Sequence, residues 1–135
     1  MKIVIDTNCL LMCIPKISPY RIVWDKILSK ECQLCISNDI LEEYDEILSS
    51  KTNSSIAFNV ISTILESDPY ITDPHFRFNL IQTDLDDNKF VDCAIASNAS
   101  YIVTNDLHFK VLDSIGFPKV KRMNLSQFSN LLKGN

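Results

Sequence analysis

The chain begins with a short β-branched run that ends abruptly in polar residues. The run Ile3–Ile5 comes directly before Asp6, Thr7 and Asn8. An unbroken apolar run of this kind suits a strand that is buried on both faces, as in a parallel sheet covered by helices. Ligands bind at the carboxyl ends of such strands, so Asp6 stands where chemistry is expected. The residues leave a second role open, in which Asp6 or Thr7 merely caps the following helix.

Length and charge limit the classes of protein to consider. The chain has 135 residues, 46% of them hydrophobic, and we expect one globular domain over residues 1–135. It contains no apolar run near the ~20 residues that span a bilayer and no secretory signal, so we expect a cytoplasmic protein with no membrane partner. Its 13 basic and 17 acidic residues give a net charge of −4, which argues against a broad basic surface. Any contact with nucleic acid must therefore be local or mediated by a metal ion.

The cysteines do not suggest a disulfide framework or a zinc site. Their number is odd and no signal peptide precedes them: Cys9, Cys13, Cys32, Cys35 and Cys93. Cys32 and Cys35 have CxxC spacing, but no second pair completes a tetrahedral site. We expect buried structural cysteines, because free Cys behaves as a small hydrophobic residue.

Ser37, Asn38 and Asp39 supply N-cap chemistry for a helix that is expected to run to about Ser49. It carries several acids, and its apolar residues recur at helical spacing. At ~100° per residue, Glu43 lies at the edge of the apolar stripe, whereas Glu42 and Glu46 point nearly opposite. Glu43 can therefore face the sheet, and the other two are expected to be solvated.

A second group of acids opens a later apolar helix. Negative charge is favourable at a helix N-terminus, but capping explains only one or two of these residues. Asp87 falls in line with the apolar stripe and is expected to face the sheet, with Asp84 and Asp86 as capping or supporting groups and Asp92 solvated. Asp84, Asp86 and Asn88 remain alternatives to Asp87 as the functional residue of this segment.

The design of the first strand is repeated later in the chain. The run Tyr101–Val103 ends in Thr104, Asn105 and Asp106, and so brings a second acid to the same edge of the sheet. Strands and helices alternate through the whole sequence, which predicts an α/β fold.

Four carboxylates are thus expected to meet at one edge of the sheet: Asp6, Glu43, Asp87 and Asp106. Clustered acids raise one another's pKa values and are costly unless a cation lies among them. Magnesium or manganese suits such oxygen ligands, whereas zinc would favour His or Cys, which these four positions lack. A hard divalent ion activates water and stabilises charge on a phosphoryl group. The acids therefore indicate phosphodiester hydrolysis.

Other acidic α/β sites fit less well. A haloacid-dehalogenase-type phosphatase needs an acid where Asn8 stands, and a response-regulator receiver needs paired acids where Asp6 stands alone. A glycine-rich phosphate loop is excluded, because Gly116 and Gly134 are the only glycines.

Four blocks, in order, carry a resemblance to a known family: Val4–Asn8, Ser37–Leu48, Asp84–Phe90 and Tyr101–Asp106. Together they resemble the PIN domain, a nuclease fold common among the toxins of toxin–antitoxin systems. The resemblance implies a three-layer α/β/α sandwich around a central, mostly parallel sheet. It also implies Mg²⁺- or Mn²⁺-dependent cleavage of single-stranded RNA and inhibition by a cognate antitoxin protein. The family's acidic metal-binding quartet matches Asp6, Glu43, Asp87 and Asp106, with Asn8 and Thr104 as polar supports.

Two other functions remain open at this point: a PIN-like module that binds RNA or protein without turnover, and a nuclease specific for DNA or for a nucleic-acid structure. Lys89, His108 and Lys110 are candidate contacts for an RNA backbone, although a solvated surface explains them equally well. By analogy with the family, a homodimer through the helix pair of residues 39–67 is also expected.

Overall fold

The centre of the molecule is a five-stranded sheet in which every strand runs parallel to its neighbours. We describe a computed structural model that covers residues 1–134. The strand order is β3-β2-β1-β4-β5. The strands are β1 (Lys2–Ile5), β2 (Gln33–Ile36), β3 (Tyr70–Ile71), β4 (Tyr101–Val103) and β5 (Arg122–Met123). The predicted α/β class with a parallel sheet is confirmed.

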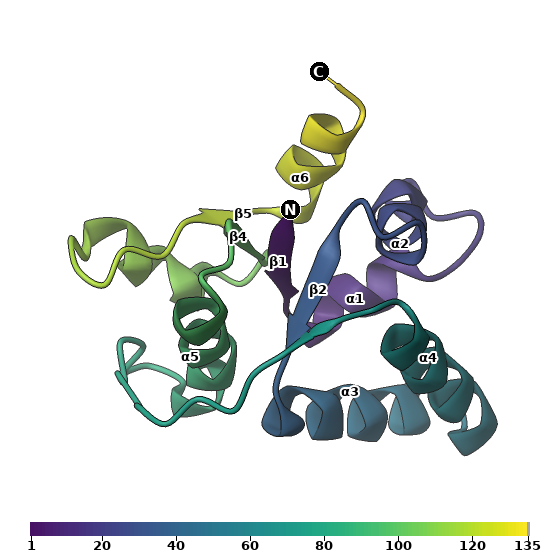
Figure 1. Ribbon diagram of the computed structural model, residues 1–135, viewed down its shortest axis with the longest axis horizontal. Coiled ribbons are helices and arrows are strands. Elements are labelled where there is room, and N and C mark those ends of the chain that lie inside the picture. Colours follow the sequence, from purple (N-terminus) through teal and green to yellow (C-terminus); the bar gives the residue numbers. More distant parts are fainter. Residues whose placement is uncertain (135) are drawn as a thin grey trace.

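Helices cover both faces of this sheet. Helix α5 packs against β1, β2 and β4, and Figure 1 shows α1, α2 and α6 on the opposite side. Helices α3 and α4 pack against one another as a helical hairpin beyond the end of β2. The α-helices are α1 (Thr7–Cys13), α2 (Arg21–Leu28), α3 (Asn38–Lys51), α4 (Ser54–Glu66), α5 (Asn88–Ser97) and α6 (Leu125–Leu132), with 3₁₀ helices η1 (Leu85–Asp87) and η2 (Leu107–Ser114). This is the three-layer α/β/α arrangement that the resemblance implied.

The register of the two central strands decides which polar residues meet. Ile5 of β1 pairs with Val103 of β4, and the backbone N–H of Asp6 donates to the Val103 carbonyl at 3.1 Å. Both strands therefore end at the same level, which brings Asp6 beside Thr104. The pairing is stable because β1 is buried on both faces, as its β-branched sequence predicted.

The hydrophobic core includes all five cysteines, and each of them is a free thiol. Burial raises the pKa of the Cys13 thiol to about 12, with a smaller contribution from the charge of Asp6. These cysteines are therefore unreactive packing residues, as predicted.

The segment between β3 and η1 has no helix or strand and is held against α5 by two buried polar side chains. The side chain of Asn88 accepts from the N–H of Ile81 at 2.9 Å and donates to its carbonyl at 2.8 Å. Asp92 accepts from the N–H of Phe78 at 3.2 Å. The prediction that Asp92 is solvated is wrong, since the residue is only 5% exposed. A helical projection identifies the side of the helix that faces away from the sheet. It cannot show that the segment between β3 and η1 covers that side.

None of the helices within residues 1–134 is long and apolar enough to cross a membrane. The prediction of one domain extends to residue 135, which lies outside the described residues, and it stays a prediction.

Candidate metal centre

The four acids that the sequence predicted to meet all line one cavity. This cavity has a volume of about 180 Å³ and lies where β1 and β4 end. Asp6 follows β1, Glu43 lies on α3, Asp87 ends η1 and Asp106 precedes η2. Thr7, Asn8, Ile47 and Phe90 complete the lining. The parallel sheet thus brings carboxylates from four distant segments to one place.

Asp6 serves as a helix cap and as a wall of the cavity at once. Its Oδ1 atom accepts a hydrogen bond from the N–H of Cys9 at 2.8 Å, in the first turn of α1. Its Oδ2 atom accepts from the hydroxyl group of Thr104. The two roles that the sequence left open for this residue are therefore compatible, and the carboxylate has a fixed orientation.

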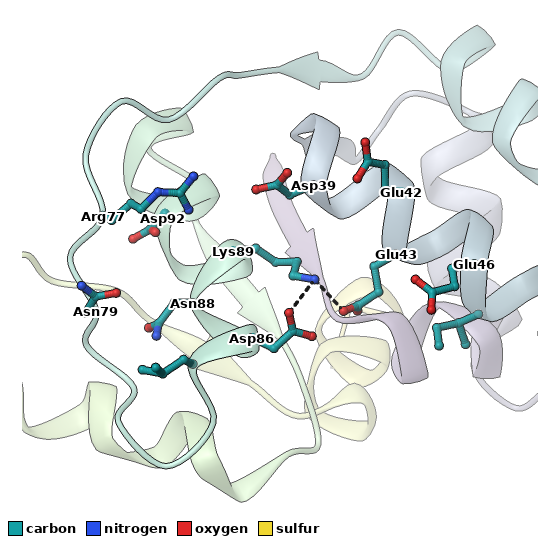
Figure 2. A pocket seen from close by; sticks show the side chains of 12 residues that line it. Asp39, Glu42, Glu43, Glu46, Arg77, Asn79, Asp86, Asn88, Lys89 and Asp92 are labelled. Carbon is teal, nitrogen blue, oxygen red and sulfur yellow. Dashed lines mark hydrogen bonds and ion pairs between the residues drawn. The ribbon is translucent and has the colours of Figure 1, made fainter.

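Glu43 is held by two donors from different elements. The hydroxyl of Thr7 donates to its Oε2 atom, and the ammonium of Lys89 donates to Oε1 at 2.8 Å. Lys89 also lies 3.1 Å from Oδ1 of Asp86, and Figure 2 shows it reaching between these two carboxylates. Burial lowers the pKa of Lys89, but its bonds with Glu43 and Asp86 outweigh burial and raise that pKa overall, so the ammonium is charged.

Asp87 differs from both, because one of its carboxylate oxygens has no hydrogen-bond partner. Within residues 1–134, its Oδ2 atom is buried and unpaired. Burial, together with the smaller effects of the charges of Asp84 and Asp106 and against a lowering by His108, raises the pKa of Asp87 to about 6. A buried oxygen among like charges is the feature that a bound cation would relieve.

His108 lies beside this unpaired oxygen. Its Nδ1 atom is 3.4 Å from Oδ1 of Asp106 and 3.7 Å from Oδ2 of Asp87. One ligand atom each from Asp84, Asp87 and His108 lie within 4.8 Å of one another, which is close enough to hold one metal ion. From the sequence, His108 is a candidate RNA contact only. The signal that could have found it beside the acids is the Asp-x-His spacing, since Asp106 caps η2 and accepts from the N–H of His108 at 2.9 Å.

The structure separates the alternatives for the third acidic position. Asn88 is turned toward Ile81, away from the cavity. Asp86 is exposed and paired with Lys89. Asp84 and Asp87 lie next to His108, and of these two only Asp87 lines the cavity.

The donor set fits a divalent cation of the magnesium or manganese type. It consists of several carboxylates and one imidazole, and it includes the Oδ2 atom of Asp87, for which the described residues provide no hydrogen-bond donor. Carboxylates suit Mg²⁺ and Mn²⁺, and an imidazole is also an acceptable ligand for Mn²⁺. The chemistry of these residues therefore supports a metal site at the Asp87 end of the cavity.

A wider groove of about 470 Å³ adjoins the cavity and shares Glu43 and Ile47 with it (Figure 2). Glu42 and Glu46 lie on its α3 side and are exposed, as predicted. Of the predicted RNA contacts, Lys110 and His108 are exposed, whereas Lys89 is mostly buried in its ion pairs.

The parallel sheet and the acidic cavity at its carboxyl edge define an α/β protein with a candidate metal centre. A sequence model of the PIN domain matches residues 2–108, and the chain belongs to the PIN-domain family. No curated protein sequence matches it significantly.

Two solved structures resemble the chain over nearly its whole length. One is VapBC2 from Rickettsia felis bound to a DNA fragment from its promoter, with a TM-score of 0.60, 23% identity, and coverage of 92% of this chain and 98% of the other. The second is VapBC-1 from nontypeable Haemophilus influenzae, with a TM-score of 0.61, 15% identity, and coverage of 93% and 99%. At these identities the likeness shows a common fold.

Proposed function

We propose that this protein is a divalent-metal-dependent endoribonuclease that hydrolyses phosphodiester bonds of single-stranded RNA. The observation that carries the proposal is the Oδ2 atom of Asp87, which within residues 1–134 is buried without a hydrogen-bond partner, on a residue that lines one cavity with Asp6, Glu43 and Asp106. Membership of the PIN-domain family supports the same reaction class.

In this proposal, Asp87 and Asp106 hold a Mg²⁺ or Mn²⁺ ion together with Asp84 and His108, whose ligand atoms lie close by. When bound, the ion supplies an activated water and stabilises negative charge on the phosphate. Asp6 contributes a carboxylate whose orientation is fixed by Thr104 and by the start of α1.

Glu43 has a different part in the same cavity. Its carboxylate is fixed by Thr7 and Lys89, yet each oxygen keeps a second lone pair. We propose that Glu43 orients the attacking water by accepting a hydrogen bond from it. Lys110 and the exposed face of His108 are the groups that would contact the RNA backbone, and Asn8, which lines the cavity, is a polar support of the site.

The partners are also part of the proposal. We assign the chain the toxin role in a toxin–antitoxin pair in the cytoplasm, with a cognate antitoxin protein as its inhibitor. The likeness to two VapBC structures supports a paired protein. A homodimer through α3 and α4 is a further expectation. Co-expression with the product of the neighbouring reading frame tests the pair: we expect a stable complex without cleavage activity.

The function is tested by digestion of end-labelled single-stranded RNA and DNA oligonucleotides of the same sequence. We expect RNA cleavage with Mn²⁺ or Mg²⁺, none with EDTA, and a loss of at least a hundredfold in Asp87→Asn. Asp45→Asn is the matched control, because Asp45 is an exposed acid on α3 and should leave the rate unchanged. Cleavage that survives EDTA contradicts the proposal. Preferred cleavage of DNA would indicate a DNA nuclease, and metal binding without any cleavage would indicate a binding module.

A further inference from the structure

The two ends of the acidic cavity differ in how their charge is balanced. At one end, both oxygens of Glu43 have donors, from Thr7 and from the ammonium of Lys89. At the other end, Oδ2 of Asp87 is buried without a hydrogen-bond partner in the part of the chain that the structure describes. The chain thus supplies a lysine ammonium at the Glu43 end, whereas the basic group beside Oδ2 of Asp87 is the imidazole of His108, at 3.7 Å.

The pair of Lys89 and Glu43 is well shielded from water. The side chain of Lys89 is 16% exposed and that of Glu43 is 19% exposed, whereas Asp86, the other partner of Lys89, is 72% exposed. A shielded carboxylate needs a cation nearby, and the removal of one partner leaves the other uncompensated. Lys89 therefore interacts with Glu43 at close range and with little screening.

The position of Lys89 in its helix argues that its role lies in this contact. It is the second residue of α5, and a positive charge in the first turn is unfavourable to a helix because of the helix dipole. Its side chain instead crosses to Glu43 on α3 and lines the wider groove (Figure 2). Helix stability does not explain a lysine at this position, but the charge of Glu43 does.

We propose that the ammonium group of Lys89 is the resident cation of the Glu43 end, so that the site takes up one divalent ion, at the Asp87 end, and no second ion at Glu43. Two-metal sites hold a second divalent ion roughly 4 Å from the first, and that ion needs carboxylates whose charge no other cation balances. Here a fixed ammonium already balances Glu43. The inference rests on the proposed metal site, and it makes Lys89 a positioning residue that sets the number of ions.

Calorimetric titration of the metal-free, full-length protein with MnCl₂ measures this number directly. We expect one Mn²⁺ per chain in the wild type. In Lys89→Gln, the carboxylates of Glu43 and Asp86 lose their ammonium partner, and we expect a second, weaker Mn²⁺ to bind. Lys89→Arg keeps the charge and should return the number to one. Lys51→Gln is the control, because Lys51 is an exposed lysine at the end of α3.

Glu43→Gln provides a second readout in case Lys89→Gln does not fold. If Lys89 balances Glu43, the neutral glutamine should leave one Mn²⁺ per chain with an affinity within about threefold of the wild type. An affinity loss of tenfold or more would show that Glu43 ligates the ion, and would overturn the inference.

The outcomes also separate this inference from the proposed function. Two ions in the wild type, or one ion in a folded Lys89→Gln, would overturn the inference and leave the nuclease proposal standing. A wild type that binds no Mn²⁺ would overturn both.

Discussion

The hydroxyl group of Thr104 donates a hydrogen bond to the Oδ2 atom of Asp6, although the two residues lie 98 positions apart in the chain. The same hydroxyl accepts a hydrogen bond from the backbone N–H of Asp106 at 3.0 Å. One buried side chain, 1% exposed, therefore orients two of the four acids. It can do so because β1 and β4 are neighbours in register and end at the same level.

Replacement of Thr104 by valine keeps the shape of this side chain and removes the hydroxyl. We expect Mn²⁺ to bind about tenfold more weakly, because groups that hydrogen-bond to metal ligands typically contribute a factor of 10 to 100 to affinity. We also expect the free energy of unfolding to fall by about 1–2 kcal/mol, since Asp6 and Asp106 each lose a buried partner. Calorimetry and urea denaturation measure the two effects.

Thr63→Val is the matched control for this variant, because the Thr63 hydroxyl bonds only to the backbone of its own helix at an exposed position. It should leave Mn²⁺ affinity unchanged. Equal Mn²⁺ affinity in Thr104→Val and the wild type would show that Thr104 has no part in positioning the acids.

The raised pKa of Asp87 makes the stability of the metal-free protein depend on pH. The folded state holds the pKa of this carboxyl at about 6, above its ordinary value of 3.8. The folded state therefore binds the proton more tightly than the unfolded state. The contribution of Asp87 to stability is fully present below pH 3.8 and is lost as pH rises through about 6. Asp87→Asn removes this dependence, and at pH 7.5 we expect it to stabilise the metal-free protein by about 1–2 kcal/mol, after allowance for solvent screening.

Bound metal should reverse the sign of this effect. Mn²⁺ binds the deprotonated carboxylate, so its stabilisation of the wild type should grow as pH rises through about 6. Asp87→Asn should show almost no stabilisation by Mn²⁺. Thermal unfolding at pH 5 and pH 7.5, with and without Mn²⁺, measures both effects. A metal-free Asp87→Asn that is less stable than the wild type at pH 7.5 would contradict the account.

The side chain of Asn88 holds the segment of residues 72–84 against α5 through Ile81. Asn88→Ala leaves the N–H and the carbonyl of Ile81 without partners, and we expect the free energy of unfolding to fall by about 2–3 kcal/mol. Limited proteolysis should then cut within residues 72–84. Because Asn88 points away from the cavity, the number of bound Mn²⁺ ions should not change. If Asn88→Ala bound fewer Mn²⁺ ions than the wild type, Asn88 would be a metal ligand. Asn59→Ala, at an exposed position of α4, is the control for stability.

The sequence could predict this fold because its strongest patterns were local. The β-branched runs of β1 and β4 each end in a hydroxyl, an amide and an acid, and a parallel sheet necessarily places such ends together. The helical projection put Glu43 and Asp87 on the sides that face the sheet, and in the structure both line the cavity where β1 and β4 end. These inferences needed only the period of a helix and the geometry of a strand.

The remaining features depend on contacts between distant segments, which no local pattern contains. Asp92 is covered by a loop that packs on the outer side of α5. Lys89 pairs with Glu43 across 46 positions of sequence, so it could not be distinguished from a solvated lysine. His108 meets Asp87 only because η1 and η2 fold toward one another. The positions of the acids could thus be predicted, but the way in which their charges are balanced could not.

A divalent ion at the Asp87 end of the acidic cavity can be seen directly. We suggest recording the anomalous diffraction of a crystal of the wild-type protein soaked in MnCl₂. We expect one strong peak per chain, within bonding distance of Asp87 and next to Asp106 and His108, with Lys89 still bound to Glu43. A cavity with no peak at saturating Mn²⁺, or an ion bound only elsewhere on the surface, would contradict the proposed metal site.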